Sequence, residues 1–494
     1  MTGAVRGPRE RQWPAILLAT IVASAAFANV AAYIAHAGNP LVMSDAWYFI
    51  DAFLRKAVEQ GASVADFFVK RSATDHAQPL IKALMLANAE WWGLDFVYEA
   101  LAGLAFALAT FVVLAATTWR GARERQPAWL HGLLLGTLAA CLVTLNSGMV
   151  FSWSLVTLTY LCYFLAACAG ACAWRALAGG GRAALAAVSL VVAFTMDDVG
   201  LLIALALVLS VAFAAARRRD FRAAWPVIAI IVASELCYLV ASRLWLHSGA
   251  EAVTGAVGAS AFARVWELRG SAVEIARVVL ATSLAHVNQI VHYFPDDVRR
   301  VQSVLAGVAL LAHAWFWWRA WRVQWNAAVF HAVALMLLAY GMVAGIVHAR
   351  VPEFGVAYLN EPRYVVMYLL GDVALVLMLL GHPLRMAHRA ARVGEAVVLV
   401  VLLALQVALT RYSWDEARYL GIYYHQMARQ MLVLGEGGMP PNCLPILSAC
   451  GMPPAQREAA FEFLQRHQLN LYSPAFVARY RLEAVVQPAA EPAN

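Results

Sequence analysis

The chain has 494 residues, of which 62% are hydrophobic and only 14% are charged. Soluble globular domains carry roughly a quarter charged residues, so this composition excludes an ordinary soluble fold. The formal net charge of +7 does not indicate nucleic-acid binding, because the basic residues stand in short clusters between apolar runs. Apolar runs of roughly 20 residues, long enough to cross the hydrocarbon core, recur along the chain. The sequence therefore predicts an all-α polytopic membrane protein.

The first apolar run, from Pro14 to about Ala35, follows a basic N-terminal segment. The sequence AHA at residues 35–37 resembles a signal-peptidase site. The run is about 22 residues long, however, whereas the apolar region of a signal peptide has roughly 7–15. We therefore expect a retained first span. Cleavage would leave the segment that follows on the same outer side of the membrane.

Apolar length and the positions of arginine predict about eleven spans in all. After the first, they are expected at about residues 97–118, 128–146, 150–174, 183–195, 201–216, 223–246, 304–318, 326–348, 364–380 and 395–410. Every arginine-rich connection then lies on one face, which the positive-inside rule assigns to the cytoplasm. We expect a bacterial inner-membrane protein with a cytoplasmic N-terminus and a periplasmic C-terminus.

Two segments lie outside this pattern of spans. Ala272–Ile290 would reverse the topology of everything after it if it crossed the membrane, so we interpret it as a helix at the outer interface. Residues 1–410 then form the transmembrane bundle, and residues 411–494 form a small helical periplasmic tail. The tail pattern predicts two amphipathic helices, at about 413–434 and 454–470.

Two of the seven cysteines, Cys443 and Cys450, lie in this tail, and the other five lie in predicted spans. An oxidising compartment permits a disulfide between Cys443 and Cys450, but their spacing leaves open whether the bridge forms. A metal site at this pair is disfavoured, because the nearest histidines are distant in sequence.

The predicted outer connections hold most of the acidic, histidine and arginine residues that could do chemistry. The first, residues 36–96, contains "SDAWYFIDAF" at 44–53 and "RSATDHAQPL" at 71–80. A later turn, "MDDVG", contains Asp197 and Asp198, and the late connection contains "HARVPEFGVAYLNEPRYV". A carboxylate can accept a proton from a hydroxyl, and arginine can hold a phosphate through charge-assisted hydrogen bonds. Acidic, histidine and arginine residues gathered on one face together favour a reaction on a phosphate-bearing substrate at the membrane surface.

Asp45 has two interpretations. The pairs Trp47/Ile50 and Phe49/Phe53 match helical spacing, so Asp45 could serve only as the N-terminal cap of an interfacial helix. Alternatively, it is a reactive carboxylate close to the end of the first span. Likewise, Arg363 in "NEPRYV" could simply extend along the interface to reach water. We interpret His286 and His292 as structural or surface residues.

The "MDDVG" turn follows a short apolar segment. From Arg182 to Asp197 the chain covers only about 22 Å as a helix, less than the ~30 Å hydrocarbon core. The two acids would then lie slightly below the interface. Acids facing lipid are costly, so we expect them to face a wet cavity or a cationic partner. A tilted hairpin with solvated acids is the alternative.

The layout resembles the GT-C superfamily of membrane glycosyltransferases, which take a sugar from a polyprenyl-phosphate carrier. "SDAWYF" resembles the family's acidic motif in the first outer loop, although the common Asp-Glu pair is Asp45-Ala46 here. "DHAQPL" is similar to the Pro-containing turn between two interfacial helices, and "NEPRYVVMYLL" is similar to the Arg-Tyr entry of a late span. The resemblance covers roughly the first 380 residues.

The resemblance implies a glycosyl transfer at the periplasmic face, from a polyprenyl-phosphate-linked donor to a glycan, lipid or protein acceptor. Asp45 would be the general base, and the transfer would invert the anomeric centre. The substrate-binding candidates are Asp75, His76, Lys82, Asp197, Arg350, Tyr358, Arg363 and Tyr364. Among them, Asp75 and His76 would position acceptor or sugar, and Arg350, Arg363 and Lys82 would hold the leaving phosphate.

No cofactor is firmly predicted, and a divalent metal ion stays an open alternative because Ala46 replaces the second acid of the family motif. Three other functions are also open. A surface-polysaccharide polymerase or ligase would use the same donors but depend on Arg363 rather than Asp45. A multi-pass transporter would place charges deep in the spans, break helices and repeat its halves. An assembly partner would catalyse nothing.

Overall fold

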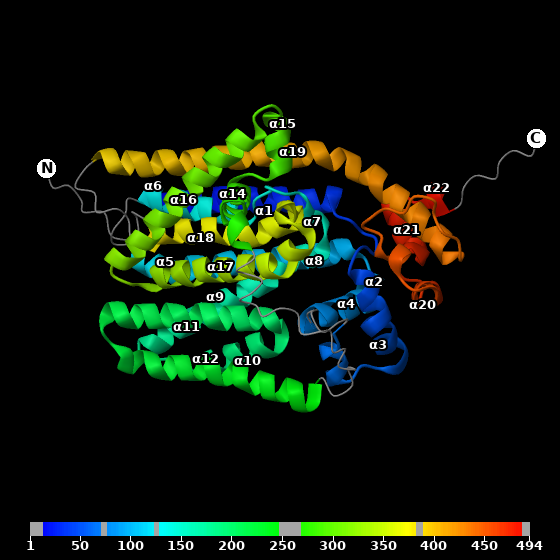
Figure 1. The fold of residues 1–494 in the computed structure, drawn as a ribbon, viewed down its shortest axis with the longest axis horizontal. Helices are drawn as coiled ribbons and strands as arrows, with labels where there is room; N and C mark the ends of the chain where they lie inside the picture. The colour runs from blue at the N-terminus through cyan, green and yellow to red at the C-terminus, as the bar shows by residue number, and fades with distance from the viewer. Residues whose placement is uncertain (1–12, 71–76, 123–127, 247–267, 382–388, 487–494) are drawn as a thin grey trace, which may run out of the picture.

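The computed structural model describes residues 13–70, 77–122, 128–246, 268–381 and 389–486, and the regular elements among these residues are all helical. Within them, nine helices are long and apolar enough to cross a membrane. Most of them run along the long axis of the molecule (Figure 1). They are α1 (Trp13–Ala37), α5 (Phe96–Ala122), α8 with α9 (Ser154–Thr157 and Thr159–Leu177), α11 (Asp198–Arg218), α12 (Phe221–Ala241), α16 (Val298–Arg322), α17 (Ala327–Phe354), α18 (Val365–Gly381) and α19 (Arg389–Gly435). The chain is an all-α, multi-pass membrane protein.

Two further apolar helices, α6 (Ala128–Leu142) and α10 (Arg182–Met196), have 15 residues each. At 1.5 Å per residue each reaches only about 22 Å, short of the ~30 Å core. Both stand where the sequence predicts a span, so every predicted span contains a helix, while eleven crossings stay a prediction. A Cβ added to Gly132 of α6 would lie 2.5 Å from the carbonyl oxygen of Ala15, so this glycine lets α6 approach α1 closely.

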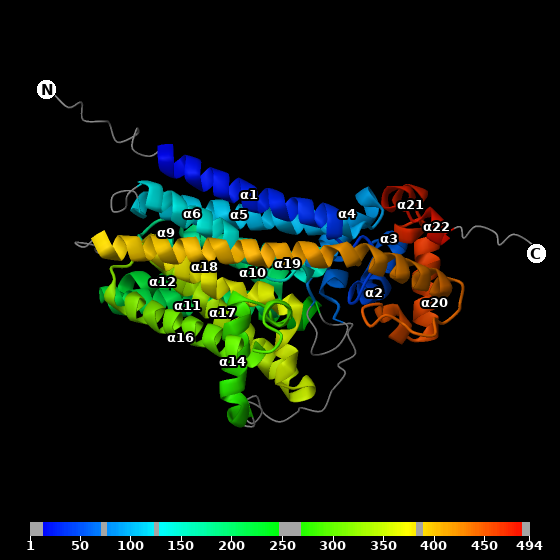
Figure 2. The ribbon, with the colours of Figure 1, turned by 90° about the horizontal axis from the view of Figure 1, so that it is seen from above.

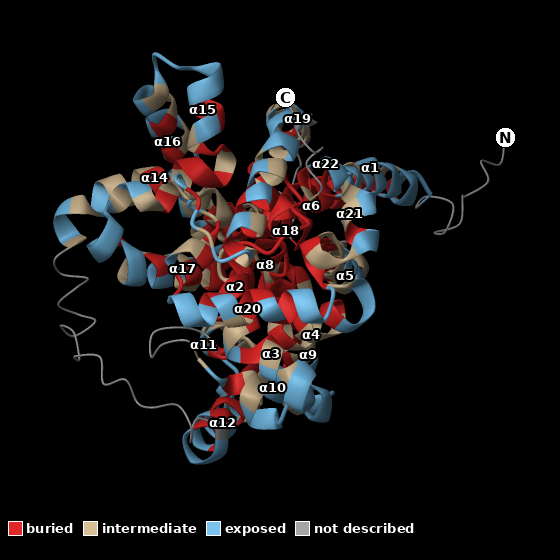
Figure 3. Cartoon of the chain, turned by 90° about the vertical axis from the view of Figure 1, so that its right-hand side faces the viewer, coloured by how far each residue is buried: buried red, intermediate tan, exposed pale blue. Residues whose placement is uncertain are grey.

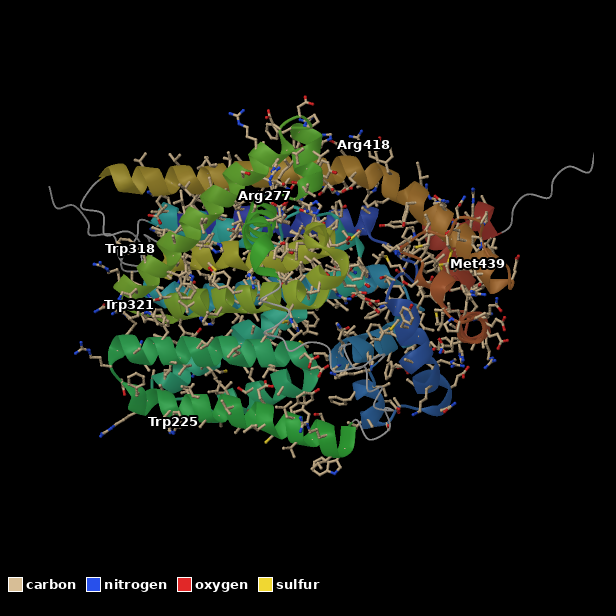
Figure 4. The ribbon with its side chains drawn as sticks, viewed as in Figure 1. Trp225, Arg277, Trp318, Trp321, Arg418 and Met439 are labelled. Atoms are coloured by element: carbon tan, nitrogen blue, oxygen red, sulfur yellow. A yellow bond between two sulfur atoms is a disulfide. The ribbon has the colours of Figure 1, made fainter. Side chains whose placement is uncertain are left out.

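The two ends of the bundle differ in composition. At one end α11 joins α12, α16 joins α17, and α19 begins (Figure 1). The last turns of α11 and α16 carry arginine. Trp225, Trp318 and Trp321 lie toward this end in Figure 4, and each is more than half exposed. Arginine beside exposed tryptophan is typical of a membrane–water interface.

The opposite end carries the short helices that follow α1. They are α2 (Ala46–Phe49), α3 (Arg55–Gln60) and α4 (Pro79–Trp92), with a π-helical turn at Ile50–Leu54 between α2 and α3. Pro79 begins α4, where its missing N–H leaves no helical hydrogen bond unmade. Figure 3 views the molecule from this end and shows buried residues gathered around α18, α6, α8 and α2. The described part of the predicted first loop therefore contains several short helices, and some of its residues belong to the core.

The segment interpreted as interfacial forms two helices, α14 (Ala272–Leu284) and α15 (Val287–Tyr293), which meet at a bend of 74°. Figure 2 shows α14 lying across the long axis rather than along it. The buried Asn146 fixes this bend: its amide donates to the carbonyl oxygen of Thr282 at 2.8 Å, and its carbonyl accepts the N–H of His286 at 2.7 Å.

The tail is continuous with the last span. α19 extends unbroken from Arg389 to Gly435, so the boundary expected at residue 410 lies inside a helix, and no separate helix begins at Ser413. The increase in polarity after residue 410 accompanies no proline, and Gly421, within the polar part, does not end the helix. The second predicted tail helix corresponds to α20 (Pro454–Arg466), followed by α21 (Pro474–Tyr480) and α22 (Glu483–Val486).

The tail packs against the segment between α1 and α5. The Asn470 amide group donates to the carbonyl oxygens of Pro40 and Leu94 at 2.9 and 2.7 Å. Asp95, at the start of α5, accepts hydrogen bonds from Tyr480 at 2.7 Å and from Arg479 at 3.1 Å. The tail is thus tied to the end of the bundle that carries α2–α4.

Candidate functional site

A cavity of about 230 Å³ lies between the first loop and the bundle, at the end that carries α2–α4. One side of it comes from α2, the turn before α4, and α4 itself. The other side comes from α8, α9, α17 and α18. Five of the residues predicted from the sequence line it together: Asp45, Lys82, Arg350, Arg363 and Tyr364. Three segments that are distant in the sequence therefore contribute to one chamber.

Asp45 immediately precedes α2, the position that a helix cap would occupy. Its side chain makes no capping hydrogen bond to the helix. The carboxylate lines the cavity next to Tyr48 and Phe49, and Asp45 is half-buried. Capping therefore does not account for an acid at this position.

Lys82, in the first turns of α4, is 2% exposed. Its ammonium group donates to the carbonyl oxygens of Phe67 and Val69 at 3.0 and 2.5 Å, and lies 5.6 Å from the centre of the Phe53 ring. Burial in this way holds the cation in place at the wall of the cavity.

The turn Val64–Phe68 supplies the first of these carbonyls and directly precedes Val69, and it is itself fixed by charge. Asp66 accepts hydrogen bonds from Lys56 at 2.5 Å and from the backbone and hydroxyl of Ser63, each at 2.8 Å. The hydrogen bond from Lys56 is the largest of the effects that lower the pKa of Asp66 to about 2. At neutral pH this carboxylate is ionised and accepts these hydrogen bonds, which stabilise the turn next to Lys82.

Arg363 stands in a cage of aromatic rings at the entry of α18. Its guanidinium carbon lies 5.7, 5.6 and 5.4 Å from the ring centres of Trp153, Tyr358 and Tyr364. It donates to the Tyr358 hydroxyl, while its Nε–H is buried and has no hydrogen-bond partner. Neither Arg363 nor the exposed Arg350 pairs with an acid in the part of the chain that the structure describes.

Asp197 is not among the residues that line the cavity. It is 2% exposed and accepts hydrogen bonds from the Tyr238 hydroxyl at 2.5 Å and the Ala77 N–H at 2.8 Å, and its carboxylate lies 3.1 Å from the Lys70 ammonium group. The expectation that these acids face a cationic partner is confirmed, because Lys70 also lies 3.5 Å from Asp198. Asp197 thus joins the α10–α11 turn to the first loop.

Of the non-glycine residues with positive φ, one lines the cavity and two contact or adjoin residues at its wall. Ser44 (φ 47°) precedes Asp45, Gln78 (φ 49°) lines the cavity, and Asp197 (φ 50°) holds the backbone next to Gln78. Such conformations cost on the order of 1 kcal/mol or more, and they persist only where surrounding contacts impose them. Surrounding contacts thus hold a strained backbone at Gln78 in the cavity wall and at Ser44, next to Asp45.

Sequence reasoning missed Trp153. The span predicted at residues 150–174 is interrupted here, since α7 (Met149–Ser152) ends and α8 begins on either side of this residue. Trp153 lies in an extended conformation, lines the cavity and is 6% exposed, and its indole N–H has no hydrogen-bond partner. The only signal in the sequence is "FSWSL", two serines around a tryptophan in an apolar run.

Asp75 and His76 lie outside the described residues, so their predicted role stays a prediction. The rest of the site gives little support for a metal ion. Among the residues that the structure does describe, no three histidine, cysteine or acidic side chains come together as a metal site. Asp45 is the one carboxylate among the named residues of the cavity wall, together with three cationic side chains. Cations repel a divalent metal ion and attract an anion.

Cys443 and Cys450 form a disulfide in the structure, with their Cα atoms 6.5 Å apart. The bridge closes a loop between α19 and α20, next to the segment that carries Asp45.

Comparisons of the chain with protein-family models, with curated proteins and with solved structures found no match. Function must therefore be argued from the chemistry of the cavity.

Proposed function

We propose that this protein is a membrane glycosyltransferase that moves a sugar from a polyprenyl-phosphate-linked donor to a cell-envelope glycan, lipid or protein acceptor. The observation that carries the proposal is the composition of the cavity. Lys82, Arg350 and Arg363 stand around one chamber with the carboxylate of Asp45, and the two arginines have no acid partner among the described residues. Arg363 is partly buried, and a partly buried cation without an anion is costly, so a phosphate is the ligand that best completes this arrangement.

The walls of the cavity also fit a lipid-linked sugar. Leu155, Val156 and Met367 present apolar surface from helices of the bundle, where a polyprenyl chain would lie. Tyr48, Phe49 and Tyr364 provide aromatic rings on which a sugar can stack. The chamber thus combines an apolar side, a cationic group and aromatic faces at one end of the spans.

In the proposed reaction an acceptor hydroxyl oxygen attacks the anomeric carbon as its proton passes to Asp45. The bond from the anomeric carbon to the phosphate oxygen breaks on the opposite face, so the anomeric centre inverts. The products are the glycosylated acceptor and polyprenyl phosphate. Arg350, Arg363 and Lys82 stabilise the charge that develops on the leaving phosphate. Asp75 and His76 would position the acceptor or sugar. No step requires a metal ion.

The reaction would take place at the periplasmic face of the bacterial inner membrane. In that topology the arginine-rich end of the bundle is cytoplasmic, as the positive-inside rule requires. The cavity lies at the other end, next to the disulfide-bonded tail, and an oxidising periplasm is where such a bridge persists.

Transport is the second candidate, because some features that it requires are present. The helix broken at Trp153 and the bent pair α14–α15 are discontinuous helices. Glu99, Glu235 and Asp372 lie within candidate spans. Of these, Glu99 is held by Asn88 at 2.9 Å and Ser154 at 3.2 Å, which accounts for it as a structural group.

The deciding experiment compares lipid-linked intermediates and surface glycans by mass in a deletion strain and its parent. A glycosyltransferase leaves its donor unused and its product absent, and both return with the wild-type gene but not with Asp45→Asn. A polymerase or ligase would be restored by Asp45→Asn but not by Arg363→Gln. Unchanged glycans in the deletion strain, with altered uptake or export of a solute, would instead identify a transporter.

A further inference from the structure

The disulfide-bonded loop of the tail contacts the backbone next to Asp45. The loop runs from Asn442 to Gly451, and the N–H of Ser44 donates to the carbonyl oxygen of Ile446 at its centre, at 2.7 Å. Ile446 and Ser44 are about 400 residues apart in the chain, so this hydrogen bond is a specific tertiary contact. It reaches the residue immediately before the proposed base.

Ser44 needs such a contact. Its φ of +47° places it in the left-handed region, which costs a non-glycine residue roughly 1–2 kcal/mol. The conformation of Ser44 sets the direction in which the chain enters α2 and hence where the Asp45 side chain lies. The Ala46 N–H continues the same turn by donating to the carbonyl oxygen of Met43 at 3.1 Å.

The loop that supplies the carbonyl is held rigidly. The Gln430 side chain, 9% exposed on α19, donates to the carbonyl oxygen of Asn442 at 2.6 Å and accepts the Leu444 N–H at 2.9 Å. The Cys443–Cys450 bridge closes the ring around Ile446. Gln430 and the disulfide therefore fix the Ile446 carbonyl from two sides.

A second tail element, α20, packs against the same turn. The Trp47 ring, two residues after Asp45, is fully buried and lies 4.8 Å from the Phe461 ring of α20. Its indole N–H donates to the carbonyl oxygen of Val42 at 3.1 Å. The segment around Asp45 is thus enclosed by the loop on one side and by α20 on another.

We propose that the Cys443–Cys450 loop positions the proposed base, so that the tail forms part of the catalytic site and transfer depends on the intact bridge. The proposal rests on the proposed function, because it assigns Asp45 its role in transfer. Ser44, Gln430 and the cysteine pair are positioning residues: they act through Asp45 and touch no reacting atom.

The test uses Gln430→Met, which keeps the length of the side chain but removes both hydrogen bonds to the loop. We expect faster hydrogen exchange at the Ser44 amide, read from a peptide that covers residues 40–48. We also expect kcat to fall about 10- to 100-fold, the effect of a small misplacement of a reacting group, with KM for the donor unchanged. Gln426→Met, at an exposed site one turn earlier on α19, is the matched control and should change neither quantity.

Reduction tests the bridge itself on the full-length protein. A reductant, or the double substitution Cys443→Ser with Cys450→Ser, should raise exchange at Ser44 and lower kcat in the same way. Gln430→Glu should be intermediate, since it still accepts the Leu444 N–H. Unchanged exchange at Ser44, or faster exchange with unchanged kcat, overturns the positioning role. Failure of the proposed function is recognised separately, because Asp45→Asn would then retain transfer whatever the state of the bridge.

Discussion

The site combines two residues whose surroundings differ in kind. Three aromatic rings lie close around the guanidinium group of Arg363, and they do not neutralise its charge. Asp45 faces the same cavity from a turn whose backbone is held in a left-handed conformation at Ser44. A fixed cation and a fixed carboxylate across one chamber can serve the two ends of a displacement, the leaving phosphate and the attacking hydroxyl.

Asp45→Asn should remove transfer without removing the fold. The substitution keeps shape and hydrogen bonding but not the proton acceptor, and loss of a general base typically lowers the rate by 10²–10⁴. Asn is as good as Asp at the position before a helix, so the substitution should leave the start of α2 intact. Transfer should be measured in membranes supplied with donor lipid, and folding by expression and thermal stability.

Asp51→Asn is the control for that substitution. Asp51 stands in the π-helical turn after α2, where it pairs with Arg55 at 3.2 Å, and it does not line the cavity. Loss of this partly exposed pair should change stability by no more than about 1 kcal/mol and leave transfer intact. Near-parental transfer by the Asp45 variant would make that acid structural and move the chemistry to the late loop around Arg363.

Arg363→Gln should weaken binding of the phosphate-bearing donor. A hydrogen bond to a charged group contributes about 1.5–3 kcal/mol, so the apparent donor affinity should fall roughly 10- to 150-fold. Arg418→Gln is the control, because Arg418 is exposed and pairs with Asp415 at 2.7 Å outside the cavity. Donor titrations in the transfer assay measure the effect, and an unchanged donor dependence would argue against a phosphate site at Arg363.

The residue types of the site could be read from the sequence, but their contacts could not. Acids and arginines in outer connections indicated Asp45, Lys82, Arg350 and Arg363, because charges rarely stand in an apolar chain without a role. Trp153 carries no charge and lies in an apolar run, so neither charge nor hydropathy distinguished it. Asp197 was recognised as an acid that needs a cation, but its link to Lys70 joins segments more than 100 residues apart.

At the scale of elements, apolar length located the helices well and helix breaks poorly. Each predicted span contains at least one helix, since crossing a membrane and forming a long apolar helix require the same run of residues. The break at Trp153 and the unbroken α19 were missed for one reason: hydropathy reports where lipid contact begins and ends, not where backbone hydrogen bonding does. The bend between α14 and α15 depends on Asn146, which lies in the connection between α6 and α7.

The α10–α11 turn should act on the site through the first loop. Asp197→Asn keeps a group that can contact Tyr238 and Ala77 but removes the charge that faces Lys70. The Lys70 side chain is 19% exposed and also lies 3.5 Å from Asp198, so the loss of stability should stay below the cost of about 3–5 kcal/mol that is typical of a fully buried ion pair. We expect faster hydrogen exchange in the peptide around residues 77–82 and partial loss of transfer.

Glu353→Gln serves as a comparison, because Glu353 is an exposed acid of the late connection that forms no ion pair within the described ranges. It should alter neither exchange nor transfer. If Asp197→Asn abolished transfer as fully as Asp45→Asn while exchange at 77–82 stayed the same, Asp197 would contact substrate directly, as the sequence had predicted.

At the scale of the whole molecule, the long axis separates two kinds of surface. The start of α1 and the last described helix, α22, lie at opposite ends of that axis (Figures 1 and 2). The arginine-bearing ends of α11 and α16 lie at one end with the exposed Trp225, Trp318 and Trp321, and the cavity, the short helices and the disulfide lie at the other. If the membrane surrounds the apolar helices between these ends, the start of α1 and α22 lie on opposite sides of it. The chain then crosses the membrane an odd number of times.

This arrangement predicts that the C-terminus lies outside the cytoplasm. A reporter active only in the periplasm should be active when fused after Asn494, and one that needs the cytoplasm should be silent there. A fusion after Gly381, at the end of α18 on the arginine-rich side, should give the reverse result. The two fusions differ by one crossing, α19, whose 47 residues reach about 70 Å, more than twice the ~30 Å core. A cytoplasmic signal after Asn494 would place the tail and the cavity on the inner side, where neither a periplasmic acceptor nor a stable Cys443–Cys450 bridge is found, and the proposed function would fail with the topology.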